Sequence, residues 1–305
     1  MKKILACILA GTLAASTLTG CGGSDGPTIE LYDGINSEMQ LIHKMVELVV
    51  EDKTDIEVNI NDQMSAVNMF REMTREDPSC DIMNSYDGTV LTTFLKLDPS
   101  DVPEGSTLYD YAKQLVNEQY GVDMLDMLGI NNTYCIAVPE TIAEQYNLET
   151  ISDLVPVAGE LTFGAEHEFF TEEGTMKFTP FTEFYGLTFA NTVPVDINLK
   201  YAAVENGNFD VTVVYTTDGL NRKAGLKVLE DDRNFFPEYN GALLVREGLY
   251  DEMAETAPEL RDILNSLSGK FTNEIMTGLT YAVDVEGRSV EEVAREFLTE
   301  QGLLG

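Results

Sequence analysis

The sequence predicts an α/β protein made of two lobes with a cleft between them. Strand-like and helix-like segments alternate from residue 28 to 96, an order that favours a parallel sheet covered by helices. A second alternating run fills the middle of the chain, and strand-like crossings near 131–134 and 232–239 connect the two runs. The chain has 305 residues, which is the length of about two ordinary domains.

The first run begins with an alternating strand at 28–32. Asn36 or Ser37 can cap a helix that continues to about residue 52, because Leu41, Met45 and Leu48 recur at helical spacing. We expect further strands at 55–60 and 80–84, and further helices at 66–75, 90–96 and 109–118.

In the second run, the β-favouring residues 211–214 predict a short buried strand that ends at Tyr215. Pro139 stops a strand at 131–138 and opens a helix at 140–146. We also expect strands at 161–164, 226–229 and 242–245, and helices at 152–154, 198–206, 250–254, 259–267 and 290–301.

Residues 1–20 have the features of a secretion signal. Lys2 and Lys3 form a positively charged start, and the apolar run that follows is too short for a permanent membrane span. Leu18-Thr-Gly-Cys21 resembles the lipobox of bacterial lipoproteins, in which cleavage leaves the cysteine as a lipidated N-terminus. The resemblance implies a lipid anchor on Cys21 at the outer face of the cell membrane, with 21–27 as a flexible tether.

The charge of the chain limits its partners. There are 53 acidic and 19 basic residues, and the net charge is −34. This excess argues against nucleic acids and anionic lipid surfaces and favours a cationic small molecule, although solubility alone explains much of an acidic surface. Once the signal and the lipidated cysteine are set aside, Cys80 and Cys135 are too few for a disulfide framework, and the sequence leaves their pairing open.

Four tyrosines stand at predicted strand ends or lobe crossings, each beside turn-forming or small polar residues. They are Tyr86, Tyr134, Tyr215 and Tyr239. Ligands of open α/β sheets bind beyond the carboxyl ends of strands, so these rings are expected to face a ligand. A quaternary ammonium has no N–H to donate and is held instead by aromatic faces. The four tyrosines therefore predict a cation cage, although any one alone could be an ordinary half-buried strand-end residue.

Five motifs then give a specific resemblance. The chain resembles the glycine betaine, carnitine and choline substrate-binding proteins of ABC transporters, closely from about Asn131 onward and more loosely from Thr28 to Asp77. The motifs are, in chain order, Tyr86-Asp-Gly-Thr89, Asn131-Asn-Thr-Tyr134, Gly164-Ala-Glu-His-Glu-Phe-Phe170, Tyr215-Thr-Thr-Asp-Gly219 and Phe235-Phe-Pro-Glu-Tyr239.

This resemblance implies a bilobal type II periplasmic-binding-protein fold. The expected lobes are 28–133 plus 236–305 and 134–235, and the four tyrosines would form the cage from both lobes and the hinge. Thr89 would contact the polar end of the ligand. The protein would use no cofactor and would deliver a quaternary ammonium compound to an ABC permease.

Two positions differ from the family pattern. Met39, with Gln40 beside it, stands where many relatives have a glutamine, and Glu172 stands where an arginine is expected. An arginine would pair with a betaine carboxylate, whereas a glutamate repels it. We therefore expect choline, or another cation without a carboxylate, to bind as well as glycine betaine.

The other classes considered are a metal-dependent enzyme and an adhesive or structural lipoprotein. Only two histidines occur; His43 is expected at a surface or interface, and His167 lies between Glu166 and Glu168. Adjacent strand residues point to opposite faces, so one metal ion cannot readily take all three side chains. No nucleophile-elbow or nucleotide-binding glycine motif appears, and a scaffold would not need four tyrosines at a cleft. The sequence thus predicts neither enzyme nor metal site.

Overall fold

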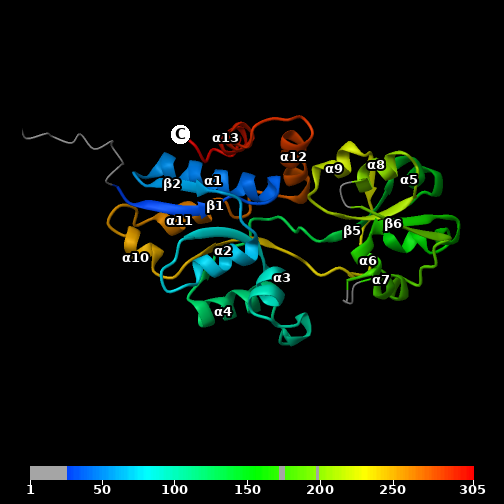
Figure 1. Cartoon of the computed structure of the whole chain (residues 1–305), viewed down its shortest axis with the longest axis horizontal. Coiled ribbons are helices and arrows are strands. Elements are labelled where there is room, and N and C mark those ends of the chain that lie inside the picture. The colour runs from blue at the N-terminus through cyan, green and yellow to red at the C-terminus, as the bar shows by residue number, and fades with distance from the viewer. Residues whose placement is uncertain (1–25, 172–175, 197–198) are drawn as a thin grey trace, which may run out of the picture.

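The computed structural model describes residues 26–171, 176–196 and 199–305, and they form two α/β lobes (Figure 1). The first lobe contains the elements from Thr28 to Met124 and from Gly241 to Glu300. The second lobe contains those from Tyr134 to Val228. The predicted signal, Cys21 and Glu172 lie outside the described residues. Within the described ranges, no helix has both the length and the apolar character that crossing a membrane requires.

The first lobe is assembled from both ends of the chain. Its N-terminal elements are β1 (Thr28–Tyr32), α1 (Ser37–Lys53), β2 (Glu57–Asn61), α2 (Ala66–Met73), β3 (Ile82–Tyr86), α3 (Asp87–Thr89), a π-helical turn (Val90–Phe94), a 3-10 turn (Pro99–Asp101), α4 (Leu108–Tyr120) and β4 (Asp123–Met124). Its C-terminal elements are β10 (Gly241–Val245), α10 (Leu249–Met253), α11 (Leu260–Asn265), α12 (Asn273–Asp284) and α13 (Val290–Glu300).

The strands of the first lobe form two sheets. β1 and β2 pair in parallel, as their βαβ order predicts. β3 pairs antiparallel with β10, which also pairs with β4. The prediction of one parallel sheet is therefore wrong at β3, because a strand from the C-terminal third of the chain takes the place beside it. β3 still begins next to β1, where the amide of Asp81 donates to the carbonyl oxygen of Glu30 at 2.8 Å.

The second lobe is built around one five-stranded sheet of order β7-β6-β8-β5-β9. β6 pairs in parallel with β7 and β8, and β5 pairs antiparallel with β8 and β9. The elements are β5 (Tyr134–Pro139), α5 (Glu140–Tyr146), 3-10 turns (Ile151–Leu154 and Ala158–Glu160), β6 (Thr162–Glu166), α6 (His167–Thr171), α7 (Phe178–Tyr185), β7 (Asn191–Val195), α8 (Lys200–Glu205), β8 (Val211–Tyr215), α9 (Gly219–Lys223) and β9 (Leu226–Val228).

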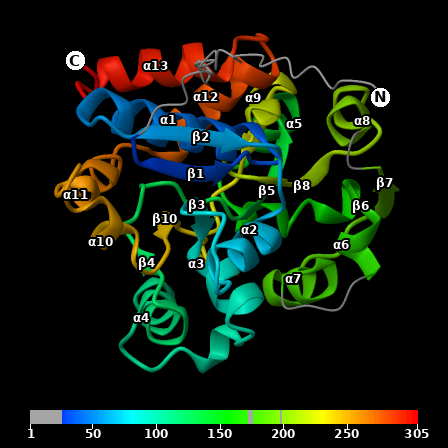
Figure 2. The same ribbon diagram turned by 60° about the vertical axis from the view of Figure 1, so that its left-hand side comes forward.

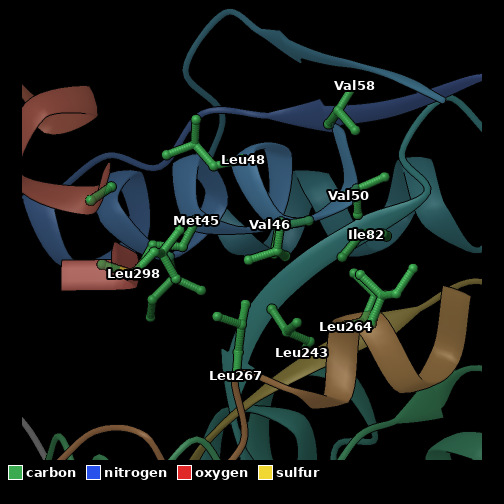
Figure 3. Close-up of a cluster of buried hydrophobic side chains, with 14 of the residues drawn as sticks. Met45, Val46, Leu48, Val50, Val58, Ile82, Leu243, Leu264, Leu267 and Leu298 are labelled. Atoms are coloured by element: carbon green, nitrogen blue, oxygen red, sulfur yellow. The ribbon is translucent and has the colours of Figure 1, made fainter. Parts of the chain in front are cut away.

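Helix α1 is capped at its start and packs within the core of the first lobe. Asn36 caps the helix, since its Oδ1 accepts from the amide of Met39 at 2.9 Å. Met45 and Val46 are fully buried and pack with side chains of β3, β10, α11 and α13 (Figure 3). α1 thus lies between the sheets and the C-terminal helices, and its first turn is held in one place.

The two lobes also meet where helix α12 lies beside α9 (Figures 1 and 2). A side chain at Gly219 would come within 2.4 Å of the Tyr281 backbone nitrogen, so only glycine allows this approach. The hydroxyl of Thr280 donates to the carbonyl oxygen of Thr217 at 2.9 Å, and that of Thr277 donates to Thr216 at 3.2 Å. The turn after Tyr215 is therefore attached to the first lobe.

Both cysteines of the described chain are buried and free. Cys80 lies in the first lobe and Cys135 in the second, so the structure answers the open question of pairing. Burial raises the pKa of the Cys80 thiol to about 12, and it also raises the pKa of Cys135.

His43 corrects one expectation, because it is fully buried rather than at a surface or interface. Its Nε2 accepts a hydrogen bond from the backbone amide of Asn84 at 3.1 Å, which fixes α1 against β3. Burial lowers the pKa of His43 to about 4. The imidazole is therefore neutral at physiological pH.

We predict that the His43→Gln variant loses part of the pH dependence of stability. The unfolded chain takes up a proton at a pKa near 6.5, whereas the folded chain does so only near 4. His43 therefore lowers the free energy of unfolding as pH falls through this window, by about 3 kcal/mol in total. Urea unfolding at several pH values should show the two proteins converging toward pH 4. Because the other ionisable groups are common to both proteins, their effect cancels in the comparison. A difference in the free energy of unfolding that stays constant with pH would contradict the prediction.

Candidate functional site

Two of the predicted tyrosines form a stacked pair in the second lobe. Tyr134 begins β5 and Tyr215 ends β8, and the antiparallel register places them opposite each other. Their ring centroids are 5.0 Å apart at an interplanar angle of 28°, and their hydroxyl oxygens are 3.4 Å apart. Val211 to Val214 are buried, whereas Tyr215 is 41% exposed. The strand thus ends by presenting an aromatic face.

Two phenylalanines pack against Tyr134 of this pair. The ring of Phe169 meets Tyr134 edge-on at a centroid distance of 6.0 Å, and that of Phe236 does so at 6.3 Å. Both phenylalanines are buried. Edge-to-face packing is favourable because the positive ring edge meets the negative face, so the orientation of Tyr134 is fixed.

Tyr239 lies on the second crossing between the lobes and rests on Gly88. A Cβ atom at position 88 would lie 2.5 Å from the ring carbon that bears the hydroxyl, so the ring occupies the space that a side chain would need. The backbone amide of Tyr239 donates to Asn131 Oδ1 at 2.7 Å. The buried Asp87 accepts from the amide of Asn240 at 2.9 Å, and burial raises its pKa to about 6. These contacts attach the crossing to the start of α3.

Tyr86 ends β3, and its hydroxyl donates to the carboxylate of Glu38 in α1. Asn132 Nδ2 lies 3.2 Å from both Glu38 Oε1 and the Tyr86 hydroxyl. Glu38 is only 4% exposed, and burial raises the pKa of its carboxyl. The hydroxyl of Thr217 lies near this carboxylate and opposes the rise. A buried acid is thus hydrogen-bonded to the hydroxyl of Tyr86.

The four tyrosines lie close enough to affect one another electrostatically. Tyr215 raises the pKa of Tyr86, Tyr134 and Tyr239 raise that of Tyr215, and Tyr134 raises that of Tyr239; in each case burial is the larger cause. The group therefore joins rings from β3, β5, β8 and the second crossing. It can offer several aromatic faces to a cation.

The residues expected at the polar end of a ligand lie in different surroundings. Thr89 is half-buried at the end of α3, three residues after Tyr86. Met39 is buried in the core of the first lobe, and the Gln40 amide donates to the carbonyl oxygen of Gly34 at 3.0 Å. Glu38, one position earlier, is the α1 residue that reaches the tyrosines. No pattern in the sequence indicates this role, because an acid in the first turn of a helix is common.

The segment considered for a metal ion also differs from expectation. Glu166 ends β6, and α6 begins at His167, so the segment is a strand end followed by a helix. Glu166 pairs with the buried Lys200 at 2.6 Å. Within the described part of the chain, no group of three or more His, Cys, Asp or Glu side chains could hold a metal ion.

Two α/β lobes joined by crossings define the periplasmic-binding-protein fold, which is the fold of substrate-binding proteins. Residues 28–300 match the family described as the substrate binding domain of the ABC-type glycine betaine transport system, and the chain belongs to this family. Such proteins work outside the cytoplasm with an ABC permease and are not enzymes.

Three relatives illustrate the match. The chain is 32% identical to the carnitine transport binding protein OpuCC of Listeria monocytogenes, over 94% of this chain and 91% of that protein. It is 33% identical to the ergothioneine transport permease/ergothioneine binding protein EgtU of Helicobacter pylori, over 73% of this chain and 38% of that protein. A crystal structure of a glycine betaine/carnitine/choline ABC transporter superposes with a TM-score of 0.80 at 29% identity, covering 90% of this chain and 99% of that one.

We predict that Gly88→Ala destabilises the protein by about 1–3 kcal/mol, because the new methyl group overlaps the ring of Tyr239. The matched control is Gly278→Ala in α12. There a Cβ meets nothing within 4 Å, and alanine favours the helix by up to about 1 kcal/mol. Urea unfolding of both variants is the measurement. Equal stability of Gly88→Ala and the wild type would show that the Tyr239 ring can adopt another position.

Proposed function

We propose that this protein captures a quaternary ammonium compound in a cage formed by Tyr86, Tyr134, Tyr215 and Tyr239 and delivers it to an ABC permease. The observation that supports the proposal is the stacking of Tyr134 on Tyr215 at the facing ends of β5 and β8, with Tyr86 and Tyr239 at a neighbouring strand end and crossing. The candidate ligands are glycine betaine, choline and carnitine.

The energy of such a cage suits a transport receptor. Each desolvated aromatic face is worth about 1–2 kcal/mol to a cation, so four faces give roughly 4–8 kcal/mol before the cost of ordering the ligand and the lobes. The strongly acidic chain adds a general attraction for cations. Neither contribution depends on an N–H group in the ligand, so both suit a fully methylated ammonium.

The polar end of the ligand is the less determined half of the site. Met39 packs in the core and Gln40 is engaged by Gly34, which leaves Thr89 as the candidate contact in the first lobe. Glu172 would oppose a ligand carboxylate if it faces the ligand. A receptor for another cation that lacks a carboxylate is therefore the second candidate function.

The organisation of the whole protein is part of the proposal. A lipid on Cys21 would hold the protein at the membrane, and residues 21–27 would let it reach the permease. The lobes would be 28–133 plus 236–305 and 134–235. The core clusters support a division close to this one, since the buried residues of the two second-lobe clusters run from Cys135 to Phe236, one position past the proposed boundary.

We predict that Tyr215→Ala weakens ligand binding about 5–30-fold, the loss expected for one aromatic face of about 1–2 kcal/mol. Tyr215→Phe should stay within a few-fold of the wild type, because a phenyl ring keeps the face. Titration calorimetry with choline, glycine betaine, carnitine, proline betaine and ergothioneine is the measurement. Tyr146→Ala, which removes a ring bonded to Glu160 elsewhere in the second lobe, is the control. Unchanged affinity in Tyr215→Ala would argue against the cage.

We also predict that the wild type binds choline at least as tightly as glycine betaine. The reason is the glutamate at position 172, where an arginine would pair with a carboxylate. The same calorimetry tests this order. Tight binding of glycine betaine with none of choline would contradict it, and Glu172→Arg should shift the preference toward betaine.

A further inference from the structure

The α1 helix contributes a buried carboxylate that forms no ion pair with a lysine, arginine or histidine of the described residues. Glu38 is 4% exposed, and its Oε1 accepts from the Tyr86 hydroxyl and from Asn132 Nδ2. Among the described residues, its other oxygen, Oε2, and Asn132 Oδ1 are buried and accept no hydrogen bond of good geometry. The hydroxyl of Thr217 lies near the carboxylate without satisfying Oε2 in this way. Native proteins seldom leave buried polar atoms unsatisfied, so these two oxygens mark a place where something else is expected to bind.

The groups around Glu38 are acids and uncharged polar side chains. Tyr86 faces it from β3, and Asn132, Thr217 and Asp218 face it from the first crossing and the turn after β8. Asp284 of α12 accepts from the hydroxyl of Ser37, the residue before Glu38, at 2.6 Å. His43, on the same helix, is neutral. Within the described residues, no lysine or arginine forms an ion pair with Glu38. An unpaired buried charge costs several kcal/mol, so the ionised form needs a positive partner.

We propose that Glu38 is the counter-ion of the bound cation and determines the preference of the site for charge. The proposal rests on the function proposed above. The carboxylate acts through space and through the Tyr86 hydroxyl, whose hydrogen bond to it makes the phenol ring richer in electrons and its face more attractive to a cation. The same charge repels a ligand carboxylate.

A proton balance follows from this arrangement. Without ligand, burial raises the pKa of Glu38 and favours the protonated acid. When the cation binds, the acid releases its proton to solvent and the carboxylate remains as the partner of the cation. Affinity for a cation should therefore increase with pH until Glu38 is ionised in the free protein, and then become constant.

The decisive experiment compares a cation with its neutral carbon analogue. Choline and 3,3-dimethylbutan-1-ol have nearly the same shape and differ in charge. Both are titrated into wild type and Glu38→Gln at pH values from about 5 to 9. Glutamine keeps an oxygen that can accept from Tyr86, so the cage is expected to keep its geometry. Asp284→Asn is the matched control, since it removes a nearby charge that contacts Ser37 rather than a tyrosine.

We expect the ratio of choline affinity to alcohol affinity to fall at least about tenfold in Glu38→Gln, a loss within the range of buried charge pairs. The pH dependence of choline binding should flatten in this variant and persist in Asp284→Asn. Equal weakening of both ligands, or an unchanged ratio, would show a merely structural role and overturn the inference while leaving the cage intact. Failure of the wild type to bind any quaternary ammonium would instead overturn the proposed function.

Discussion

The arrangement of the two lobes depends most on the hydrogen bonds of Asn131. They join the first crossing to the second crossing, to α12 and to the turn after Tyr215. Its side-chain oxygen accepts from the amide of Tyr239 on the second crossing. Its amide donates to Asn273 at the start of α12, at 2.8 Å. Its carbonyl oxygen accepts from the hydroxyl of Thr216, at 2.6 Å. One residue thus fixes both crossings, a C-terminal helix and the turn that follows Tyr215.

This constraint explains how four rings from distant parts of the chain come together. Tyr134 follows Asn131 by three residues, Tyr215 precedes Thr216, and the amide of Tyr239 is bound directly. Tyr86 is joined through the β3–β10 pair, in which Gly241 lies opposite it. The positions of the four tyrosines therefore follow from the way the lobes are connected, without a long loop between them.

Much of this could be predicted from the sequence, because the informative signals were local. The capped helix α1, the strand that ends at Tyr215 and the helix opened by Pro139 all lie where their patterns place them. Helix α7 was missed because Pro180 and several aromatic residues obscure its pattern, and burial of Phe181 and Tyr185 stabilises it. Helix α12 was missed because Gly278 and the two threonines Thr277 and Thr280 lower its intrinsic propensity.

The part of the site that could not be predicted depends on contacts between distant segments. Nothing near Glu38 in the chain shows that Tyr86 and Asn132 will surround its carboxylate, because those residues are 48 and 94 positions away. The position of β10 beside β3 is of the same kind. Pattern reasoning finds the rings at strand ends, while partners brought by the crossings appear only once the chain is folded.

The burial of both remaining thiols has a practical consequence. A thiol with a raised pKa that is shielded from solvent reacts slowly with alkylating probes. A protein prepared without residues 1–21 therefore behaves almost as a cysteine-free scaffold. A single cysteine introduced on each lobe could carry a fluorophore, and the distance between the two dyes would report lobe movement without replacement of Cys80 or Cys135.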